Sequence, residues 1–321
     1  ENKTVLDSFW PSEDKWIRRV CFSKHAEQWD IIGLSEPKRV HQKLLLKLLN
    51  GLDWDEPIKP ELVEKFKQCF SSWMDLQKVT WERCVIPGDA KEPLEFRLIQ
   101  TSDGADEASA AAIYCGVKRR NGLWSNQLML GKSRLTNGTI PRNEVDGAVL
   151  AVFACEIVKR SLNDRVSYTL RTIDSQILLC WIWNVNKMLI MFLFNRIREV
   201  LRLSDREQWY HVKGELNPSD EATRAGKSIE DITADSVWIN GYDWMKQDRV
   251  EDMNLTTYNE ISKSLSDDSK RIMKKEEYEL EDIKIVQTML EMDDQSMIAC
   301  IKKEINNSNG GPVPYTHQTH P

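Results

Sequence analysis

Apolar and polar positions along this chain follow two different periods, and the change from one to the other divides the sequence. Residues 1–90 carry apolar side chains mostly at the spacing of an amphipathic helix, most clearly at 40–49 and 60–76. An Asn-Gly pair at 50–51 suits a helix end. We therefore expect a small helical bundle that ends near the Pro-Gly-Asp turn at 87–89.

Beyond residue 91 the apolar pattern alternates in short stretches, which is typical of strands. These stretches predict strands at 96–101, 108–117, 123–132, 166–172 and 208–212. Longer helical patterns lie at 141–162, 175–183, 187–203 and 217–225. The first three strands follow one another directly and suit an antiparallel meander, whereas helices separate the others. This order predicts an α/β fold, a mixed five-stranded sheet flanked by helices, with an N-terminal helical region.

The pattern weakens after residue 230. Residues 231–306 are heavily charged with scattered apolar residues, and we expect a charged, partly helical extension there. Residues 307–321 are polar and rich in Pro and Gly, which predicts a flexible tail. The predicted units of the chain are therefore 1–90, 91–230, 231–306 and 307–321.

Composition narrows the class of protein only slightly. The formal net charge is −6, so the overall balance does not indicate a nucleic-acid binder, although local charge can still do so. Seven cysteines form no CxxC pair and sit among apolar residues, which predicts reduced, buried thiols. No apolar run reaches membrane-spanning length and no targeting peptide is visible, so we expect a cytoplasmic protein without a membrane partner. The chain begins with Glu rather than Met, and we expect a piece of something longer.

Candidate chemistry lies in acids at the ends or starts of the predicted elements: Asp103, Glu144, Asp174 and Asp220. Asp103 and Asp174 follow the first and fourth strands, and they become neighbours if those strands pair. Glu144 and Asp220 lie in the first turns of two helices that can lean over the same edge. Clustered carboxylates repel each other and need a cation, and hard divalent ions prefer oxygen ligands. Two such ions about 4 Å apart would suit phosphodiester hydrolysis.

Each acid alone has a simpler explanation. Asp220 could favour the positive end of a helix dipole, and Asp103 beside a glycine could belong to a turn. Asp146, which follows Glu144 closely, is turned roughly 200° away from it on a helix and suits the dipole only. Only the ordered set of acids on this order of elements is therefore informative.

Several short motifs, in order, resemble the ribonuclease H domain of BEL/Pao-type LTR retrotransposon polyproteins and the connection region that precedes it. The matching segments are WDIIGL at 29–34, GLDWDE at 51–56, DGADEASAAAIY at 103–114, KSRLTNGTIPRNE at 132–144, TIDS at 172–175 and WYHVKGELNPSDEATRAG at 209–226. The resemblance covers about residues 25–245. The sequence departs from the family's pattern at 104–105, Ile173 and 215–216, and Asp146 is an additional acid.

The resemblance implies a function and a site. Position by position, the family's metal-binding acids fall on Asp103, Glu144, Asp174 and Asp220. The family's activity is cleavage of the RNA strand of RNA/DNA hybrids with two Mg²⁺ ions, for which Mn²⁺ can substitute. The implied partners are the hybrid and an upstream reverse transcriptase domain of the same polyprotein, in the cytoplasm, a virus-like particle or the nucleus. The acidic net charge favours an alternative, a non-catalytic ribonuclease H-fold module for binding or assembly.

Basic residues leave two interpretations open. They could track the phosphates of a nucleic acid, or they could form an ordinary solvated surface. The candidates are Lys132, Arg134, Arg196, Arg198 and Arg202. His211 is the one candidate for the mobile histidine that many ribonucleases H carry before their last acid, but its apolar neighbours predict a strand position and a structural role. A catalytic site further requires the carboxylates of all four acids to converge.

Overall fold

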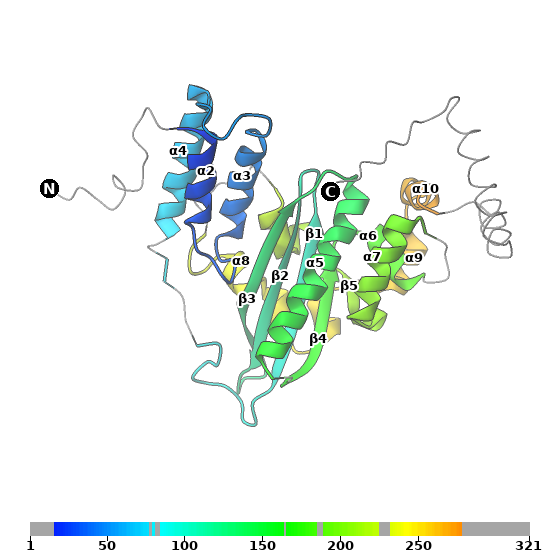
Figure 1. Ribbon diagram of the computed structural model, residues 1–321. Helices are drawn as coiled ribbons and strands as arrows, with labels where there is room; N and C mark the ends of the chain where they lie inside the picture. The colour runs from blue at the N-terminus through cyan, green and yellow to red at the C-terminus, as the bar shows by residue number, and fades with distance from the viewer. Residues whose placement is uncertain are drawn as a thin grey trace, which may run out of the picture.

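The computed structural model describes residues 16–76, 79–80, 84–163, 165–184, 189–224 and 232–277, with the backbone alone at 72–75. The predicted tail at 307–321, and the part of the predicted extension beyond 277, lie outside the described residues. A central sheet carries helices on its faces, and a separate group of helices stands at the β3 edge (Figure 1).

The sheet has five strands in the order β3-β2-β1-β4-β5. The strands are β1 (Phe96–Gly104), β2 (Ala108–Lys118), β3 (Trp124–Leu135), β4 (Val166–Ile173) and β5 (Trp209–His211). β1, β2 and β3 are antiparallel neighbours, whereas β4 runs parallel to β1 and β5 parallel to β4. The predicted mixed five-stranded sheet is therefore confirmed. The first and fourth strands pair, which is the condition under which Asp103 and Asp174 become neighbours.

Burial explains the composition of these strands. β1 is buried along its whole length, and β2 is buried at all but its last residue. Alanines dominate β2, so other elements can pack closely on both of its faces. β3 lies at the edge of the sheet and alternates between buried and half-buried positions, as a strand with one covered face does.

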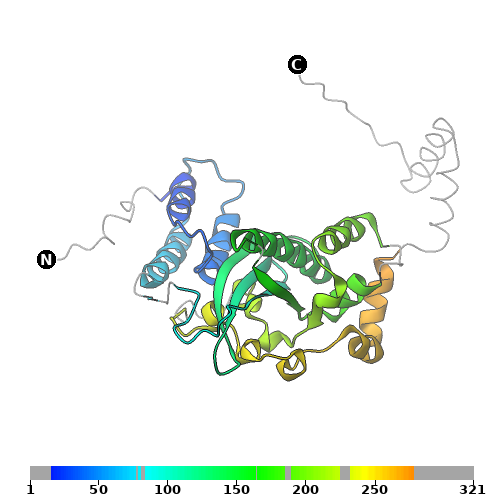
Figure 2. The same ribbon diagram turned by 90° about the horizontal axis from the view of Figure 1, so that it is seen from below.

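The long helix α5 (Ile140–Ser161) covers one face of the sheet, against β1 and β2 (Figure 2). Thr139 precedes the helix, and Pro141 stands in its first turn, where the missing N–H of proline costs no hydrogen bond. Val145, Ala148 and Val152 face the core. The helix predicted at 141–162 is therefore confirmed.

Two further helices, α6 (Gln176–Trp183) and α7 (Met191–Arg202), pack against α5. Trp181 of α6 is 1% exposed, which confirms its prediction as a core residue. The helix predicted from residue 187 begins later, at Met191, because Leu189 forms an isolated bridge with Glu277.

The prediction of a helix at 217–225 is wrong in the type of helix. Residues here form the short 3-10 helix η5 (Pro218–Ala222), with Asn217 as its N-cap. The Asn217 side chain donates to the carbonyl of Ser102, and the Thr223 hydroxyl donates to Asp103. Because both flanks of the turn are fixed to the end of β1, the chain has no room to continue as an α-helix.

Residues 232–277, predicted as a charged extension, pack along the sheet. Their elements are α8 (Val237–Asn240), η7 (Asp243–Lys246), η8 (Val250–Met253), α9 (Tyr258–Ser264) and α10 (Asp267–Lys275). Trp238 and Trp244 are buried on the face of the sheet opposite α5 (Figure 2). Thr256 then exchanges two backbone hydrogen bonds with His211 of β5, of 2.8 and 2.9 Å. The scattered apolar residues of this charged segment are thus the residues that it buries.

The N-terminal region is helical, as predicted, and consists of α2 (Arg18–Ala26), α3 (Glu36–Lys47) and α4 (Pro60–Asp75). It has its own apolar cluster, in which Cys21, Leu49 and Phe66 are buried. α3 docks on β3, where Lys43 Nζ donates to the backbone carbonyl of Ser133 at 2.9 Å. The helical region is therefore fixed to the sheet by polar contacts.

Two predictions from composition meet the structure here. Among the described cysteines, Cys84 is exposed in the segment that leads into β1, so the expectation of buried thiols is wrong at that position, whereas the others are buried. Within the described part of the chain, no helix is both long and apolar enough to cross a membrane.

Candidate metal centre

Three of the predicted acids meet at one end of the sheet. Asp103 lies near the end of β1, and Asp174 directly follows β4, the parallel neighbour of β1. Glu144 reaches the same point from the first turns of α5. Each of the three offers a carboxylate oxygen, and these oxygens lie within 4.8 Å of one another. Parallel pairing of β1 and β4 brings the two aspartates together, because parallel strands end at the same edge.

Glycines bring the third acid close enough to join them. A Cβ atom on Gly147 of α5 would lie 2.5 Å from the backbone oxygen of Asp103. A Cβ atom on Gly104 would overlap the backbone of Asn143 and Glu144. The Gly147 contact shows that a small residue lets this helix lie close to the sheet. The Glu144 carboxylate is therefore positioned by backbone contact and not only by its own side chain.

Burial and mutual repulsion disfavour the charged forms of these acids. Burial, and then the charges of Asp174 and Asp103, raise the pKa of Glu144 well above its ordinary value. Burial, and then the charge of Asp103, raise the pKa of Asp174 to about 7. Burial also raises the pKa of Asp103, against the opposing effect of the hydrogen bond from Thr223.

The oxygens of this cluster fit a hard divalent cation. Within the described part of the chain, the buried atoms Glu144 Oε2 and Asp174 Oδ1 have no hydrogen-bond partner. A buried carboxylate oxygen without a donor is costly, and a cation between such oxygens removes that cost. The ligands are all oxygen, which suits Mg²⁺ or Mn²⁺ and does not suit a soft metal. Asp103, Glu144 and Asp174 are therefore the residues that could hold an ion.

The fourth predicted acid lies beside this cluster and not within it. Asp220 of η5 is 4% exposed, and its charge contributes to the raised pKa values of Glu144 and Asp174. Its Oδ1 atom lies 2.5 Å from Nε of Arg224, so the acid forms an ion pair one helical turn along the chain. The structure thus places all four acids at one edge of the sheet and brings three of them within reach of one ion.

Sequence reasoning missed two residues that support the site. Thr223 fixes Asp103 through its hydroxyl group, and Asn217 fixes the turn that carries Asp220. Both lie in the motif NPSDEAT at 217–223, in which the sequence interpretation selects Asp220 alone as a ligand. Their polar side chains next to a predicted ligand were the signal that could have identified them.

His211 lies on β5, as its apolar neighbours predict. Its Nε2–H donates to the backbone oxygen of Asp174 at 3.1 Å, and burial lowers the pKa of the imidazole. The ring therefore contacts the backbone of a cluster acid and not its carboxylate.

The structure separates the predicted basic residues into two groups. Arg196 lies at the side of α7 that faces α5, whereas Arg198 and Arg202 lie on the exposed side, and Arg202 pairs with Glu199. Arg196 and Arg198 therefore do not share one face of this helix, because two residues correspond to a rotation of about 200°. Lys132 and Arg134 lie on β3, where alternation gives both the same face of the sheet.

Asp146 corrects the sequence interpretation most clearly. We expected an acid that suits the helix dipole only. Instead, its carboxylate accepts a hydrogen bond from Arg196 Nε and lies 3.4 Å from Arg134. The additional acid therefore joins β3, α5 and α7, on the side of α5 that faces away from Glu144.

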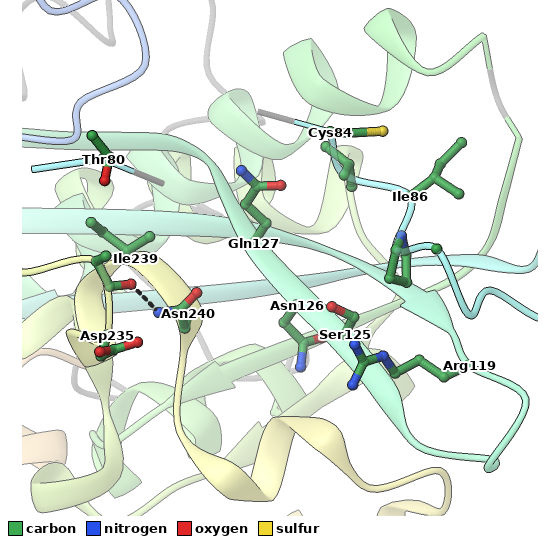
Figure 3. Close-up of a pocket in the computed structure, with 14 residues that line it drawn as sticks. Thr80, Cys84, Ile86, Arg119, Ser125, Asn126, Gln127, Asp235, Ile239 and Asn240 are labelled. Atoms are coloured by element: carbon green, nitrogen blue, oxygen red, sulfur yellow. Dashed lines mark hydrogen bonds between the residues drawn. The ribbon is translucent and has the colours of Figure 1, made fainter. Parts of the chain in front are cut away.

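A cavity of about 700 Å³ lies elsewhere in the molecule (Figure 3). It is formed by the segment 84–88, by Ser125, Asn126 and Gln127 of β3, and by residues around α8. None of the four acids lines it. The metal centre and this cavity are separate features of the fold.

Comparison with known proteins supports the same interpretation. The family model described as "Pao retrotransposon-like RNaseH-like domain" matches residues 17–175. No curated protein sequence matches the chain.

Solved ribonuclease H structures are similar to part of the chain. An N-terminal RNase H domain from Mycobacterium tuberculosis, solved as a fusion with maltose-binding protein, is 11% identical over 40% of this chain and 94% of that one, with a TM-score of 0.29. RNase H1 from the archaeon Halobacterium salinarum is 14% identical, and the match covers 40% of this chain and 96% of that one, with a TM-score of 0.27. LC11-RNase H1 from compost, in complex with an RNA/DNA hybrid, is 14% identical, and the match covers 40% of this chain and 93% of that one, with a TM-score of 0.29.

The family match includes Asp103, Glu144 and Asp174, and it extends upstream over the helical region. The resemblance that the motifs carry is therefore confirmed, and so is the ribonuclease H-like α/β fold. Residues 17–175 of this chain belong to the Pao retrotransposon-like RNaseH-like domain family.

Proposed function

We propose that this chain is the ribonuclease H of a retroelement polyprotein, an endoribonuclease that hydrolyses the RNA strand of RNA/DNA hybrids with divalent ions. One observation carries the proposal: Asp103, Glu144 and Asp174 offer oxygens within 4.8 Å of one another. Buried carboxylates this close need protons or cations between them. The family supports the class of substrate.

The residues divide the task between them. Asp103 and Asp174 would hold both ions, and Glu144 and Asp220 would complete one site each. Divalent ions there would activate a water molecule and stabilise the leaving oxygen of a phosphodiester. The chain itself keeps the carboxylates in place, through the Thr223 hydroxyl on Asp103 and the close packing of α5 on β1. Ligands fixed in advance need no reorganisation during the reaction.

The remaining parts of the chain suit a role within a longer polyprotein. An RNA/DNA hybrid would be held by its backbones, with Lys132, Arg134 and Arg196 near the site, and RNA would be distinguished by its 2′-hydroxyl group. The helical region 16–76 would connect the domain to an upstream reverse transcriptase.

A second candidate function is binding without cleavage. One observation favours it: Asp220 Oδ1 lies 2.5 Å from Arg224, so this acid already has a cationic partner. Mg²⁺ would have to displace that guanidinium before a second site could form. A protein with one ion and a neutralised fourth acid could bind a hybrid and leave it intact.

Cleavage of a labelled RNA/DNA hybrid by the full chain in Mg²⁺ or Mn²⁺ tests the proposal. We expect fragments that end in 3′-hydroxyl and 5′-phosphate groups, and no fragments from Asp174→Asn, which keeps the shape of the side chain but removes its charge. A wild-type chain that binds the hybrid and leaves it uncut would overturn the proposal of an enzyme and support the proposal of a binding module.

Metal binding is tested separately from activity. Titration with MgCl₂ should raise the melting temperature of the wild-type chain, because an ion that binds only the folded state stabilises it. Asp174→Asn should lose most of that increase. An equal increase in both proteins would place the ion elsewhere.

A further inference from the structure

Asp146 lies between two guanidinium groups that come from different elements. Its Oδ1 atom accepts from Nε of Arg196 on α7, and its Oδ2 atom lies 3.4 Å from Arg134 at the end of β3. The Asp146 side chain is 14% exposed, whereas those of Arg134 and Arg196 are 56% and 34% exposed. The acid is therefore below the surface, and the two arginines lie above it.

The arrangement leaves donors directed to solvent. Arg196 stacks on Phe192, with 3.8 Å between its guanidinium carbon and the ring centroid, so its plane is fixed as well as its Nε. One carboxylate faces two guanidinium groups, so positive charge is in excess at this point. Planar guanidinium groups with free N–H edges match the oxygens of a phosphate.

A neighbouring arginine shows the contrasting case. Arg142, in the first turn of α5, lies over the same Phe192 ring, with 5.5 Å between its guanidinium carbon and the ring centroid. Its Nε and NH2 atoms both donate to Glu276, at 3.2 and 2.9 Å. The charge of this guanidinium is therefore neutralised by one carboxylate, that of Glu276. Arg134 and Arg196 both pair with the single carboxylate of Asp146, so they keep N–H donors for a ligand.

The position relative to the metal centre fits an extended substrate. Glu144 and Asp146 project to opposite sides of the same turn of α5, so the two sites lie about one helix diameter, about 10 Å, apart. That separation corresponds to about three nucleotide steps of a duplex at 3.4 Å per step. A nucleic acid at the metal centre could therefore place a second backbone phosphate at the arginine pair.

We propose that Asp146 is a positioning residue: it holds Arg134 and Arg196 as a two-guanidinium site for one backbone phosphate of the nucleic-acid substrate. This inference rests on the proposed function. The sequence interpretation assigned Asp146 no role, and the substitution Asp146→Asn separates the two views by the sign of its effect. If the acid only screens the arginines, its loss strengthens binding of a polyanion. If it positions them, its loss weakens binding although the site becomes more positive.

The test measures binding and cleavage of a labelled RNA/DNA hybrid by the full chain. Binding is followed by fluorescence anisotropy in EDTA, so that it does not depend on catalysis. We expect Asp146→Asn to raise Kd and KM about fivefold with kcat nearly unchanged, as for a lost charge-assisted contact outside the reacting centre. Arg134→Gln and Arg196→Gln should each lower the slope of log K against log salt by about 0.9.

A double variant and a control complete the design. In an Arg196→Gln background, Asp146→Asn should have less effect than in the wild type, because the acid acts through that arginine. Asp55→Asn is the matched control, since it removes the same charge from the exposed Arg19–Asp55 pair in the helical region. It should leave Kd unchanged.

Each outcome decides one question. Tighter or unchanged binding by Asp146→Asn overturns the positioning role, even if the wild type cleaves the hybrid. A wild-type chain that binds the hybrid without cleaving it overturns the proposed enzymatic function, yet the role of the arginine pair can still be tested by binding. A wild-type chain that does not bind the hybrid overturns both the proposed function and the role of the arginine pair. If Asp146→Asn lowers the melting temperature, Arg134→Gln, an exposed change, serves in its place.

Discussion

Glu144 and Asp146 are both acids in the first turns of α5, yet the structure places them in opposite surroundings. Glu144 faces two further carboxylates, and in the described part of the chain its Oε2 atom has no donor. Asp146 faces two arginines that supply the cations it needs. The charge of Glu144 therefore needs an added cation or a proton, whereas the charge of Asp146 is already neutralised by arginines.

The comparison shows how a single helix can separate two functions. Residues two apart on a helix do not face each other, so α5 directs one acid to the end of the sheet and the other toward β3 and α7. By our proposals, metal binding belongs to the first side and substrate binding to the second. Substitutions on the two sides should therefore differ in kind as well as in size.

The largest difference is expected between Glu144→Gln and Asp146→Asn in cleavage. Loss of a carboxylate at the metal centre should lower kcat about a thousandfold, because the charge that it holds acts in the transition state. The same assay should show only the fivefold KM effect for Asp146→Asn. Comparable losses in kcat for both variants would remove the distinction between the two sides of the helix.

A second substitution tests what holds the two sides in place. Gly147→Ala should destabilise the fold by about 2 kcal/mol, because its Cβ would press on the backbone of Asp103 and force α5 away from the sheet. Gly88→Ala is the matched control, because nothing lies within 4 Å of a Cβ atom at that position. Urea unfolding of the two variants gives the comparison, and equal stabilities would mean that α5 can shift freely.

A smaller effect is expected from pH in the metal-free protein. The folded chain raises the pKa of Asp174 from 3.8 to about 7, so the folded state binds this proton more tightly than the unfolded chain does. For this group the free energy of unfolding should therefore fall as pH rises from about 4 to about 7, and Glu144 and Asp103, whose pKa values are also raised, add to the fall. Denaturant unfolding in EDTA at several pH values measures the slope, and Asp174→Asn should make it shallower. An unchanged slope in the variant would assign the effect to other groups.

The smallest effect concerns the basic residues on the exposed side of α7. Arg202 pairs with Glu199 on the surface, and such pairs contribute about 0–1 kcal/mol. Arg202→Gln should change Kd for the hybrid less than Arg196→Gln does, in the same anisotropy assay. A larger effect from Arg202 would move the substrate to the far side of α7.

Much of the site could be predicted from the sequence, because its acids mark the ends of regular elements. Alternation along 96–101 and 166–172 predicts strands, and Asp103 and Asp174 lie close to the ends of those strands. Pro141 fixes the start of α5 and with it the turn that carries Glu144. The least accurate prediction is the helix at 217–225, since contacts of Asn217 and Thr223 with β1 override the local signal.

The sequence by itself determined the order of the elements that build the sheet and the acids offered as metal ligands, because these depend on short-range periodicity and on which residues end a strand. Only the tertiary structure decided that the first and fourth strands pair, that Asp146 meets Arg134 and Arg196, and that residues 232–277 complete the core. Those contacts join residues far apart in the chain. No local pattern encodes them, because the partner of a surface charge is chosen by the packing of whole helices and strands.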